Sequence, residues 1–328
     1  MNTAAITAVG HYAPEKVVPN SYFATYLDTT EEWIMTRTGI RERRFLENGA
    51  TSDMAVEAAK KALAMRGIGP EEVECIIVAT VTPDMFFPST AALVQTKLGA
   101  KNAWGFDLSG ACSGFLFALA TGAQFIKSGT HKKVLVIGAD KMTSIMDMQD
   151  RNTCVLFGDG GAAVLLEPSE EEGYGVLDWV NYIDGSGMEA LHMKAGGSLR
   201  PSTIETVENR MHYITQDGKA VFKVAVVGMA DVSEEIMKRN NLASEDVAWL
   251  VPHQANLRII KSTADRMGVG MDRVMINIDR YGNTTAATIP SCLAEYHNDG
   301  RLKRGDNIVL ASFGAGWTWG ASLVRWSI

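Results

Sequence analysis

Residues 54–81 read MAVEAAKKALAMRGIGPEEVECIIVATV, and residues 229–254 read MADVSEEIMKRNNLASEDVAWLVPHQ. Each stretch begins with a helix pattern, passes through a short charged turn and ends in an apolar, strand-like run. The two stretches therefore have the same order of elements with the same punctuation between them. A match of this kind within one chain is typical of an internal duplication.

The repeat continues beyond these two stretches in the same order. AWGFDLSGACSGFLFA (103–118) parallels MINIDRYGNTTAATIP (275–290), each with a strand, an aspartate, a glycine turn and small residues that open a helix. VLVIGAD (134–140) parallels IVLASFGAG (308–316), and a GAAVLLE run later in the first half parallels GASLVRW near the end of the chain. We therefore expect two pseudo-equivalent halves that bring matching loops to a shared cleft.

The halves are expected to span residues 1–170 and 171–328, without a long linker between them. Short β-branched runs alternate with helix patterns, as in the strand-like run 75–81 and the helix pattern 89–98 that follows it. This alternation favours an α/β fold with buried strands. Residues 179–215 are rich in Gly, Met and polar residues and poor in periodicity, so we expect an inserted excursion or lid there.

The composition excludes several classes of protein. The chain has 328 residues with 31 basic and 38 acidic side chains, a formal net charge of -7, so no nucleic-acid partner is expected. Its four cysteines are scattered without CxxC spacing, which indicates neither a zinc site nor a disulfide framework. No run approaches the roughly 20 apolar residues of a membrane span. We expect a soluble, cytoplasmic protein without a metal.

Cys112 is the candidate nucleophile. It lies in SGACSG, directly after a strand-like run and at the first turn of a helix of small and apolar residues. Backbone amides and the positive end of the helix dipole are expected to favour thiolate over thiol there. Gly110 and Gly114 permit a tight turn and the close approach of a substrate. We interpret the other three cysteines as buried apolar side chains.

His253 is the second candidate. In VPHQAN it follows an apolar strand and precedes a helix that begins near Asn256, so its ring can project from the strand end into the cleft. An imidazole in that position can donate a hydrogen bond to a thioester oxygen or exchange a proton. The other five histidines have no comparable surroundings, and we interpret them as structural.

Asn283 is the third candidate, in RYGNTTAA on the second-half counterpart of the Cys112 turn. Its amide is a neutral donor that cannot take a proton from carbon. If a carbon–carbon bond forms with no base to make a carbanion, decarboxylation of a malonyl group must supply the electrons. His253 and Asn283 would then hold the developing enolate oxygen.

The stretch SFGAGWTWG near the C-terminus offers backbone donors. Amides from Phe313 to Gly316, including that of Ala315, can join the amide of Cys112 in an oxyanion hole for a tetrahedral thioester intermediate. This stretch and GDGG near Gly158 resemble nucleotide loops only superficially, because neither opens a helix after its glycines.

Four motifs in this order, DLSGACSG, VPHQANLRII, DRYGNTTAA and SFGAGWTWG, resemble β-ketoacyl-acyl carrier protein synthase III. That family starts bacterial type II fatty acid synthesis and belongs to the thiolase-like superfamily. The resemblance covers nearly the whole chain, including TEEWIMTRTGIRERR near the start. It implies a thiolase-like fold, in which two duplicated α/β halves with mixed five-stranded sheets form αβαβα layers. It also implies an acyltransferase that needs no cofactor and uses a coenzyme A thioester as substrate.

By this resemblance, Cys112 is acylated from a short acyl-CoA primer, with acetyl-CoA expected. His253 and Asn283 promote decarboxylation of malonyl-acyl carrier protein, and the product is 3-ketoacyl-acyl carrier protein. The resemblance assigns six residues to coenzyme A: Thr29, Trp33, Arg37, Arg151, Phe222 and Ala225. An indole and a guanidinium, here Trp33 and Arg151, can sandwich a purine by stacking.

The same resemblance implies two protein partners. Arg258, with Lys223 and Lys261, would dock the acidic carrier protein. Phe87, in MFFPSTAA, would reach across a homodimer interface to the neighbouring acyl pocket. An ordinary solvated helix face and ordinary loop packing are the alternatives at these positions.

The chain departs from the family pattern in two places. Ala315 stands where the family commonly has glycine, and Trp317 where it often has phenylalanine. Backbone donation survives these changes, but the shape of the pocket is altered. Residues 190–212 form a longer stretch than is usual. The choice of primer, acetyl or a branched or longer acyl group, therefore stays open.

Several other readings compete. An α/β-hydrolase with a cysteine nucleophile would explain GACSG, but its elbow has no second copy and its triad needs an acidic member rather than Asn283. A papain-like protease has the right residue types but not the α/β repeat. A biosynthetic thiolase needs a second catalytic cysteine, and Cys292 lies inside a helix pattern. A related condensing enzyme of secondary metabolism and a non-catalytic acyl-binding protein also remain.

Overall fold

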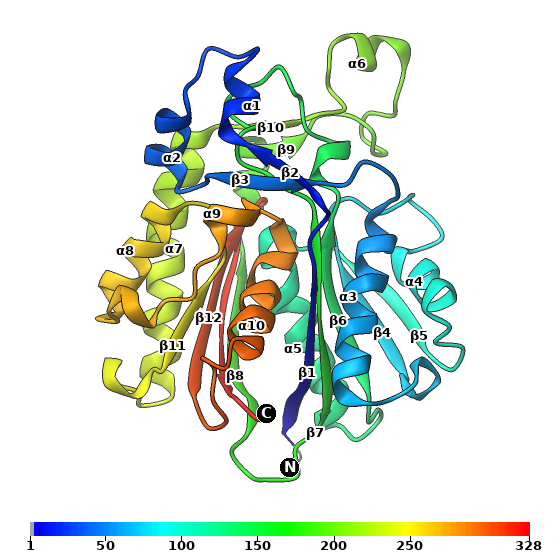
Figure 1. Cartoon of the computed structure of the whole chain (residues 1–328), viewed down its shortest axis with the longest axis vertical. Helices are drawn as coiled ribbons and strands as arrows, with labels where there is room; N and C mark the ends of the chain where they lie inside the picture. Colours follow the sequence, from blue (N-terminus) through cyan, green and yellow to red (C-terminus); the bar gives the residue numbers. More distant parts are fainter. Residues whose placement is uncertain (1–2) are drawn as a thin grey trace.

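A nine-stranded mixed sheet runs through the computed structural model, which describes residues 3–328 (Figure 1). The strand order is β11-β12-β13-β8-β1-β7-β6-β4-β5. The strands are β1 (Ala4–Tyr12), β4 (Cys75–Ala79), β5 (Trp104–Leu108), β6 (Val134–Asp140), β7 (Gly160–Pro168), β8 (Gly175–Ile183), β11 (Trp249–Pro252), β12 (Asn307–Gly314) and β13 (Thr318–Arg325).

Helices cover the two outer faces of this sheet and fill the space between its halves (Figure 1). Helices α3 and α4 lie on one outer side, α7 and α8 on the other, and α5 and α10 between the halves. Their bounds are α3 (Thr51–Arg66), α4 (Thr90–Leu98), α5 (Gly114–Lys127), α7 (Gly218–Arg239), α8 (Leu257–Met267) and α10 (Thr288–Asn298). The α/β layers predicted from the alternating pattern are confirmed.

The duplicated order of elements is visible in the structure. Helix α3 and strand β4 in the first half correspond to α7 and β11 in the second. The two central helices each follow a 3₁₀ turn, η2 (Ala111–Ser113) before α5 and η7 (Thr285–Ala287) before α10. The first residue of each turn has a positive φ, 49° at Ala111 and 50° at Thr285. Both halves therefore use the same unusual backbone geometry to turn toward the centre.

The strand count of the second half differs from the expected five. Strands β5, β4, β6, β7 and β1 form the five-stranded part, but the second half supplies only β8, β13, β12 and β11. A pairing of β1 with β8 at Ala4 and Val176 joins the two parts into one sheet. The missing fifth strand is reduced to a single parallel bridge between Leu250 and Val274.

Side chains replace the missing ladder after that bridge. The amide of Ile276 donates to the hydroxyl of Tyr296 at 3.2 Å. The amides of Asn277 and Ile278 donate to Oε1 of Gln254 at 3.1 and 3.2 Å. Because these amides already have side-chain acceptors, the chain leaves the sheet and begins α9 (Ile278–Tyr281).

The core between the halves is apolar and close-packed. Phe115, Leu116 and Leu119 of α5 are fully buried against the sheet and α10. Burying one such side chain stabilises the fold by roughly 1.5–3 kcal/mol. Gly138 on β6 has a specific role here, since a β-carbon there would lie 2.3 Å from the carbonyl oxygen of Ala286. The glycine lets η7 of the second half pack directly on a strand of the first.

Short elements form a cap over one end of the layers (Figure 1). They are β2 (Lys16–Pro19), α1 (Asn20–Ala24), α2 (Glu31–Thr38), β3 (Glu42–Phe45), β9 (Leu191–Met193), α6 (Ile204–Glu208) and β10 (Ile214–Gln216). The excursion expected over 179–215 begins later than predicted, because β8 continues to Ile183 and pairs with β13 through Tyr182 and Trp319. Residues 179–183 read WVNYI, a mostly apolar run that continues the strand and was wrongly assigned to the excursion.

Candidate active site

The turn that carries Cys112 is held by the second half of the chain. Cys112 is the middle residue of η2. The hydroxyl of Ser312 on β12 donates to the carbonyl of Cys112 at 2.9 Å, and the hydroxyl of Thr318 on β13 donates to the carbonyl of Gly110 at 3.0 Å. Ser113 donates in turn to the carbonyl of Thr318 at 3.0 Å. These three contacts fix the nucleophile's backbone to two strands.

Gly314 brings the end of β12 against the nucleophile. A β-carbon at this position would lie 2.8 Å from the amide nitrogen of Cys112, closer than real side chains come. Only glycine therefore allows this approach. The next residue, Ala315, lines an apolar cavity together with Cys112.

The thiol of Cys112 is buried, and its protonation differs from the prediction. Burial, together with the carboxylate of Asp140, raises the pKa of Cys112 to about 12. The backbone amide of Cys112 and the side chain of Asn283 lower this pKa, but by less than burial raises it. The expected thiolate is thus wrong for the free protein, because desolvation outweighs the turn's amides. A base must take the proton.

His253 lines the same cavity as this thiol. It follows β11, is 2% exposed, and burial lowers its pKa to about 3, so the ring is neutral. Its Nδ1 lies 2.7 Å from the hydroxyl of Thr288. Its Nε2 is buried and has no hydrogen-bond partner among residues 3–328. A neutral imidazole with a free nitrogen can accept a proton or donate one hydrogen bond.

Asn283 lies opposite, with its carboxamide oriented by its own turn. Its Oδ1 accepts from the amide of Thr285 at 2.9 Å, so its Nδ2 is left to face the cavity. Its backbone amide donates to Leu156 at 2.9 Å, and its carbonyl accepts from Gly158 at 3.1 Å. Asn283 is thus tied to the loop before β7 as well as to η7.

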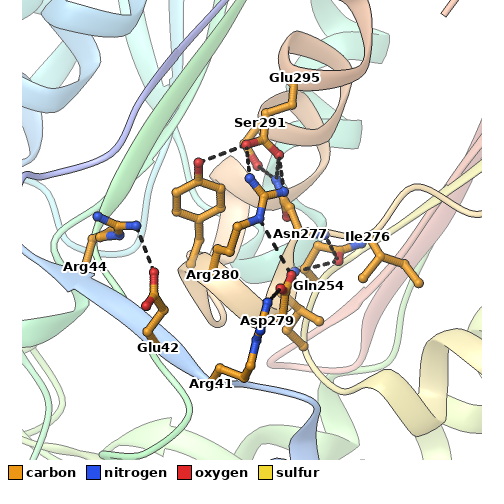
Figure 2. A network of polar contacts seen from close by, with 12 residues as sticks. Arg41, Glu42, Arg44, Gln254, Ile276, Asn277, Asp279, Arg280, Ser291 and Glu295 are labelled. Atoms are coloured by element: carbon orange, nitrogen blue, oxygen red, sulfur yellow. Dashed lines mark hydrogen bonds and ion pairs between the residues drawn. The ribbon is translucent and has the colours of Figure 1, made fainter. Parts of the chain in front are cut away.

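A polar network supports the segment between β11 and Asn283 (Figure 2). Glu295 on α10 accepts from both terminal nitrogens of Arg280 at 2.8 and 3.0 Å and from the side chain of Asn277 at 3.0 Å. Gln254, the residue after His253, donates to the carbonyls of Pro252 and Met275. One buried side chain therefore joins the strand end that carries the imidazole to the segment that leads to Asn283.

Cys112, His253 and Asn283 line one cavity of about 100 Å³. Phe222 and Ala225 of α7 line the same cavity, and no aspartate or glutamate does. A second cavity of about 170 Å³ lies on the other side of the thiol and is lined mainly by apolar side chains. Its lining includes Val81, Met142, Ile145, Leu191, Met193 and Ile214.

A larger cavity of about 580 Å³ leads from the surface to the catalytic cavity, with which it shares Leu156 and Phe222. Trp33 and Arg37 line it. The guanidinium of Arg151 lies 4.8 Å from the ring centre of Trp33, and that of Arg37 lies 5.2 Å from it. The predicted indole and guanidinium are therefore in contact with each other, and a purine between them requires Arg151 to move aside.

The remaining coenzyme candidate is Thr29. Its hydroxyl oxygen is buried without a partner among residues 3–328, and Thr29 lies outside the lining of the large cavity. Neighbouring Asp28 accepts from Arg151 through both its carbonyl and its carboxylate. The loop of residues 28–29 thus sets the position of Arg151.

Three cations lie on α7 and α8, the two helices that contribute Phe222 and Arg258 to the lining of this cavity. Lys223 of α7 and Arg258 and Lys261 of α8 are exposed, and none has an ion-pair partner in the part of the chain that the structure describes. The guanidinium of Arg258 lies 4.7 Å from the ring of Phe222 and also lines the large cavity. These three residues, which we call the mouth cations, are free to meet an anionic partner.

Phe87 lies apart from the catalytic cavity of its own chain. It is 85% exposed on the loop between β4 and α4, and its neighbour Phe86 is 82% exposed. Adjacent exposed aromatic side chains are unusual on a monomer surface. Among residues 3–328, no helix is long and apolar enough to cross a membrane, and no cluster of His, Cys, Asp and Glu could hold a metal.

Sequence reasoning missed the residues that hold the candidates in place. Ser312, Thr318 and Asp140 contact the catalytic turns from elements distant in sequence, whereas Thr285 and Thr288 lie on or directly after the Asn283 turn. Their positions could have been found only by superposing the repeats, which aligns η7 with η2. That alignment makes Ala286 the counterpart of Cys112, with Asn283 three residues earlier.

Comparisons with known proteins give one consistent result. The family model described as 3-oxoacyl-[acyl-carrier-protein (ACP)] synthase III matches residues 106–185, and that of its C-terminal part matches residues 237–326. A β-ketoacyl-[acyl-carrier-protein] synthase III of Chlorobaculum tepidum is 60% identical over 98% of this chain and 99% of its own length. One of Koribacter versatilis is 55% identical over 99% and 98%.

Solved structures agree. The 3-oxoacyl-[acyl-carrier-protein] synthase III of Aquifex aeolicus is 43% identical, with a TM-score of 0.92 over 98% of this chain and 100% of the other. The priming β-ketosynthase of the R1128 polyketide pathway is 35% identical, with a TM-score of 0.92 over 99% and 97%. The predicted thiolase-like fold is confirmed. The chain belongs to the β-ketoacyl-acyl carrier protein synthase III family, the acyltransferases that carry out the initiating condensation of fatty acid synthesis.

Proposed function

We propose that this enzyme joins an acyl group on Cys112 to a malonyl group on acyl carrier protein, with loss of carbon dioxide. The observation that carries the proposal is the lining of the catalytic cavity. It brings together a thiol, an unpartnered imidazole nitrogen and a carboxamide donor, and it contains no carboxylate that could remove a proton from carbon. Decarboxylation then remains as the source of the nucleophilic carbon.

In the first half-reaction, His253 Nε2 takes the proton from the Cys112 thiol. The sulfur attacks the thioester carbon of an acyl-CoA, and the carbonyl oxygen becomes an oxyanion. The amides of Cys112 and Ala315 hold this oxyanion. The bond to the coenzyme A sulfur then breaks, and the leaving thiolate takes the proton back from His253. The enzyme is left acylated with a neutral imidazole.

In the second half-reaction, the malonyl thioester takes the place of coenzyme A. The bond between its Cα and its carboxylate breaks, carbon dioxide leaves, and the electron pair forms an enolate. Asn283 Nδ2 and His253 Nε2 donate to the enolate oxygen, which stabilises the charge where it develops. The enolate carbon attacks the acyl carbonyl, and the bond to Cys112 sulfur breaks. The released thiolate takes up a proton from solvent, which restores the thiol, and the 3-ketoacyl product remains on the carrier.

Coenzyme A lies in the large cavity in this proposal. Its adenine stacks between Trp33 and Arg151, Arg37 and Thr29 lie near the nucleotide, and its pantetheine passes Phe222 and Ala225. The lining of the large cavity by Trp33, Arg37 and Phe222, with Arg151 beside Trp33, supports this direction of entry. The mouth cations bind the acidic surface of the carrier protein, which brings its prosthetic arm to the same entrance.

The primer and the assembly belong to the same proposal. Acetyl-CoA is the expected primer, and the acyl group occupies the apolar cavity beside Cys112. Two chains form an isologous dimer, in which Phe87 of each covers the acyl cavity of the other. Residues 1–170 supply the nucleophile, and residues 171–328 supply His253 and Asn283. The four unpaired cysteines suit the reducing cytoplasm.

Release of labelled carbon dioxide from malonyl-acyl carrier protein tests this function. We expect release that depends on acyl-CoA, with a 3-ketoacyl-acyl carrier protein product, and loss of that product in Cys112→Ala. Free acid released from acyl-CoA without condensation would instead support a thioester hydrolase. Binding of acyl-CoA without formation of either product would indicate an acyl-binding protein.

A second candidate is a priming synthase of secondary metabolism. The structural similarity to the R1128 priming β-ketosynthase, at 35% identity over 99% of this chain, supports it. Both candidates use the same chemistry and differ in the acyl groups that they accept. Comparison of kcat/KM for acetyl-CoA with that for longer and branched acyl-CoA primers distinguishes them.

A further inference from the structure

A buried carboxylate lies behind the catalytic turns. Asp140 is the last residue of β6 and is 0% exposed. Among residues 3–328, no lysine, arginine or histidine forms an ion pair with it. Burial of an unpaired carboxylate is strongly unfavourable unless hydrogen bonds compensate for the lost water. The proposed mechanism gives this group no role.

The two oxygens of Asp140 bind different halves of the chain. Oδ1 accepts from the amides of Val81 and Thr82 at 2.8 and 3.1 Å and from the hydroxyls of Thr80 and Thr82 at 2.9 Å. Oδ2 accepts from the hydroxyl of Thr285, with the amide of Ala286 at 3.5 Å. One carboxylate thus ties the end of β4 to η7.

Thr285 passes this constraint to the catalytic groups. Its amide donates to Asn283 Oδ1 at 2.9 Å. Its carbonyl accepts from the hydroxyl of Thr288 at 3.0 Å, and that hydroxyl contacts His253 Nδ1. Its φ of 50° is a conformation that β-branched residues rarely adopt, with a strain on the order of 1–3 kcal/mol. The bond to Asp140 holds Thr285 in this conformation.

We infer that Asp140 is a positioning residue that aims the Asn283 carboxamide into the catalytic cavity by fixing Thr285. The inference rests on the proposed role of Asn283 in decarboxylation. Without the amide of Thr285 at Oδ1, the carboxamide is free to rotate and present its oxygen to the enolate. Two oxygens would then repel each other where a donor is required.

A carboxylate suits this task better than a neutral side chain. Backbone amides can only donate, so Oδ1 must accept from Val81 and Thr82, and the hydroxyl of Thr285 is then drawn to Oδ2. Burial raises the pKa of Asp140, while the hydrogen bonds from Thr285, Val81, Thr82 and Thr80 lower it. In Asp140→Asn, the amide nitrogen would face the amide of Ala286, and a donor would meet a donor.

The two half-reactions, measured separately, test the inference. In Asp140→Asn, the rate of decarboxylation of malonyl-acyl carrier protein should fall about 10- to 100-fold, mainly in kcat, because the donor is misplaced rather than removed. Acylation of Cys112 by acyl-CoA, followed by mass spectrometry, should fall much less, since Asn283 and Asp140 act on that half-reaction only through the pKa of the thiol. Thr285→Val should likewise lose much more of the decarboxylation rate than of the acylation rate. Thr285→Ser should recover most of the lost decarboxylation rate.

Glu167→Gln is the matched control, because Glu167 is also buried but lies at the opposite end of β7, where it accepts from Arg66 at 2.6 Å. This variant should leave the ratio between the rates of the two half-reactions at the wild-type value. Equal losses in both half-reactions of Asp140→Asn, or full loss in Thr285→Ser, would overturn the inference. Asn283→Ala separates the two proposals: unchanged decarboxylation in that variant contradicts the proposed function itself.

Discussion

The hydroxyl oxygen of Thr288 lies 2.7 Å from Nδ1 of His253, and the same hydroxyl donates to the carbonyl of Thr285 at 3.0 Å. A hydroxyl can accept from Nδ1–H while donating to Thr285, or turn and donate to Nδ1. Both neutral tautomers of the imidazole therefore have a partner. This leaves Nε2 able to accept the thiol proton in one half-reaction and to donate to the enolate in the other.

Replacement of Thr288 by valine should slow condensation by about 10-fold. Nδ1 of His253 then loses its only side-chain partner among residues 3–328, and the imidazole ring loses its orientation. The fall should appear in kcat. Thr288→Ser keeps the hydroxyl and should recover most of the rate. Imidazole ¹⁵N chemical shifts should show a changed tautomer mixture in the valine variant alone. Equal rates in wild type and Thr288→Val would contradict a role for this contact.

Removal of the indole at Trp33 should weaken acyl-CoA binding. Stacking between an aromatic side chain and a base contributes roughly 1–3 kcal/mol, so Trp33→Ala should raise KM for acyl-CoA by about 5- to 100-fold with little change in kcat. Steady-state kinetics with acyl-CoA measures this. A pantetheine thioester without the nucleotide is the control, and its KM should be the same in both proteins. An equal rise with both substrates would rule out adenine stacking.

The mouth cations should govern the affinity for the carrier protein. Charge reversal at Lys223, Arg258 and Lys261 should raise KM for malonyl-acyl carrier protein, and this KM should lose much of its dependence on salt. Malonyl-CoA, which lacks the acidic protein, should serve as a poor but unchanged donor. Reversal of Lys60 and Lys101, exposed on α3 and after α4, is the matched control. An equal rise in KM for malonyl-acyl carrier protein after reversal of the mouth cations and of the control lysines would indicate an effect of net charge rather than of docking.

The sequence was sufficient for the repeat and for the candidates that sit on its turns. Periodicity identified α3, β4 and their second-half copies, because apolar patterns and turn residues are local properties. The same local reading missed the loss of the fifth strand after Val274. There, the Gln254 side chain takes over amides that a neighbouring strand would otherwise bind, and this contact joins residues more than twenty positions apart.

The sequence also misled on the thiol of Cys112. A helix terminus next to a cysteine predicts a stabilised thiolate, and such amides do lower its pKa. Burial of the thiol by chain segments from both halves raises this pKa by more. No local sequence pattern contains that burial. Asp140 and Ser312 were missed for the same reason, since each acts on a catalytic turn only through the packing of one half against the other.

Burial of His253 should make the protein less stable in mild acid. Burial lowers the pKa of the folded imidazole to about 3, whereas an unfolded histidine titrates near 6.5. As the pH falls from about 6.5 toward 3, the unfolded chain binds a proton that the folded chain does not. The free energy of unfolding therefore falls by up to ~1.4 kcal/mol per pH unit from this group alone, and the group has no effect above about pH 7.

Chemical denaturation from pH 7.5 to 4.5 should show a shallower slope of unfolding free energy against pH for His253→Gln than for the wild type. Cys112→Ala changes the same cavity without a group that titrates in this range, so it should keep the wild-type slope, and an unchanged slope in His253→Gln would show that the imidazole is not held neutral.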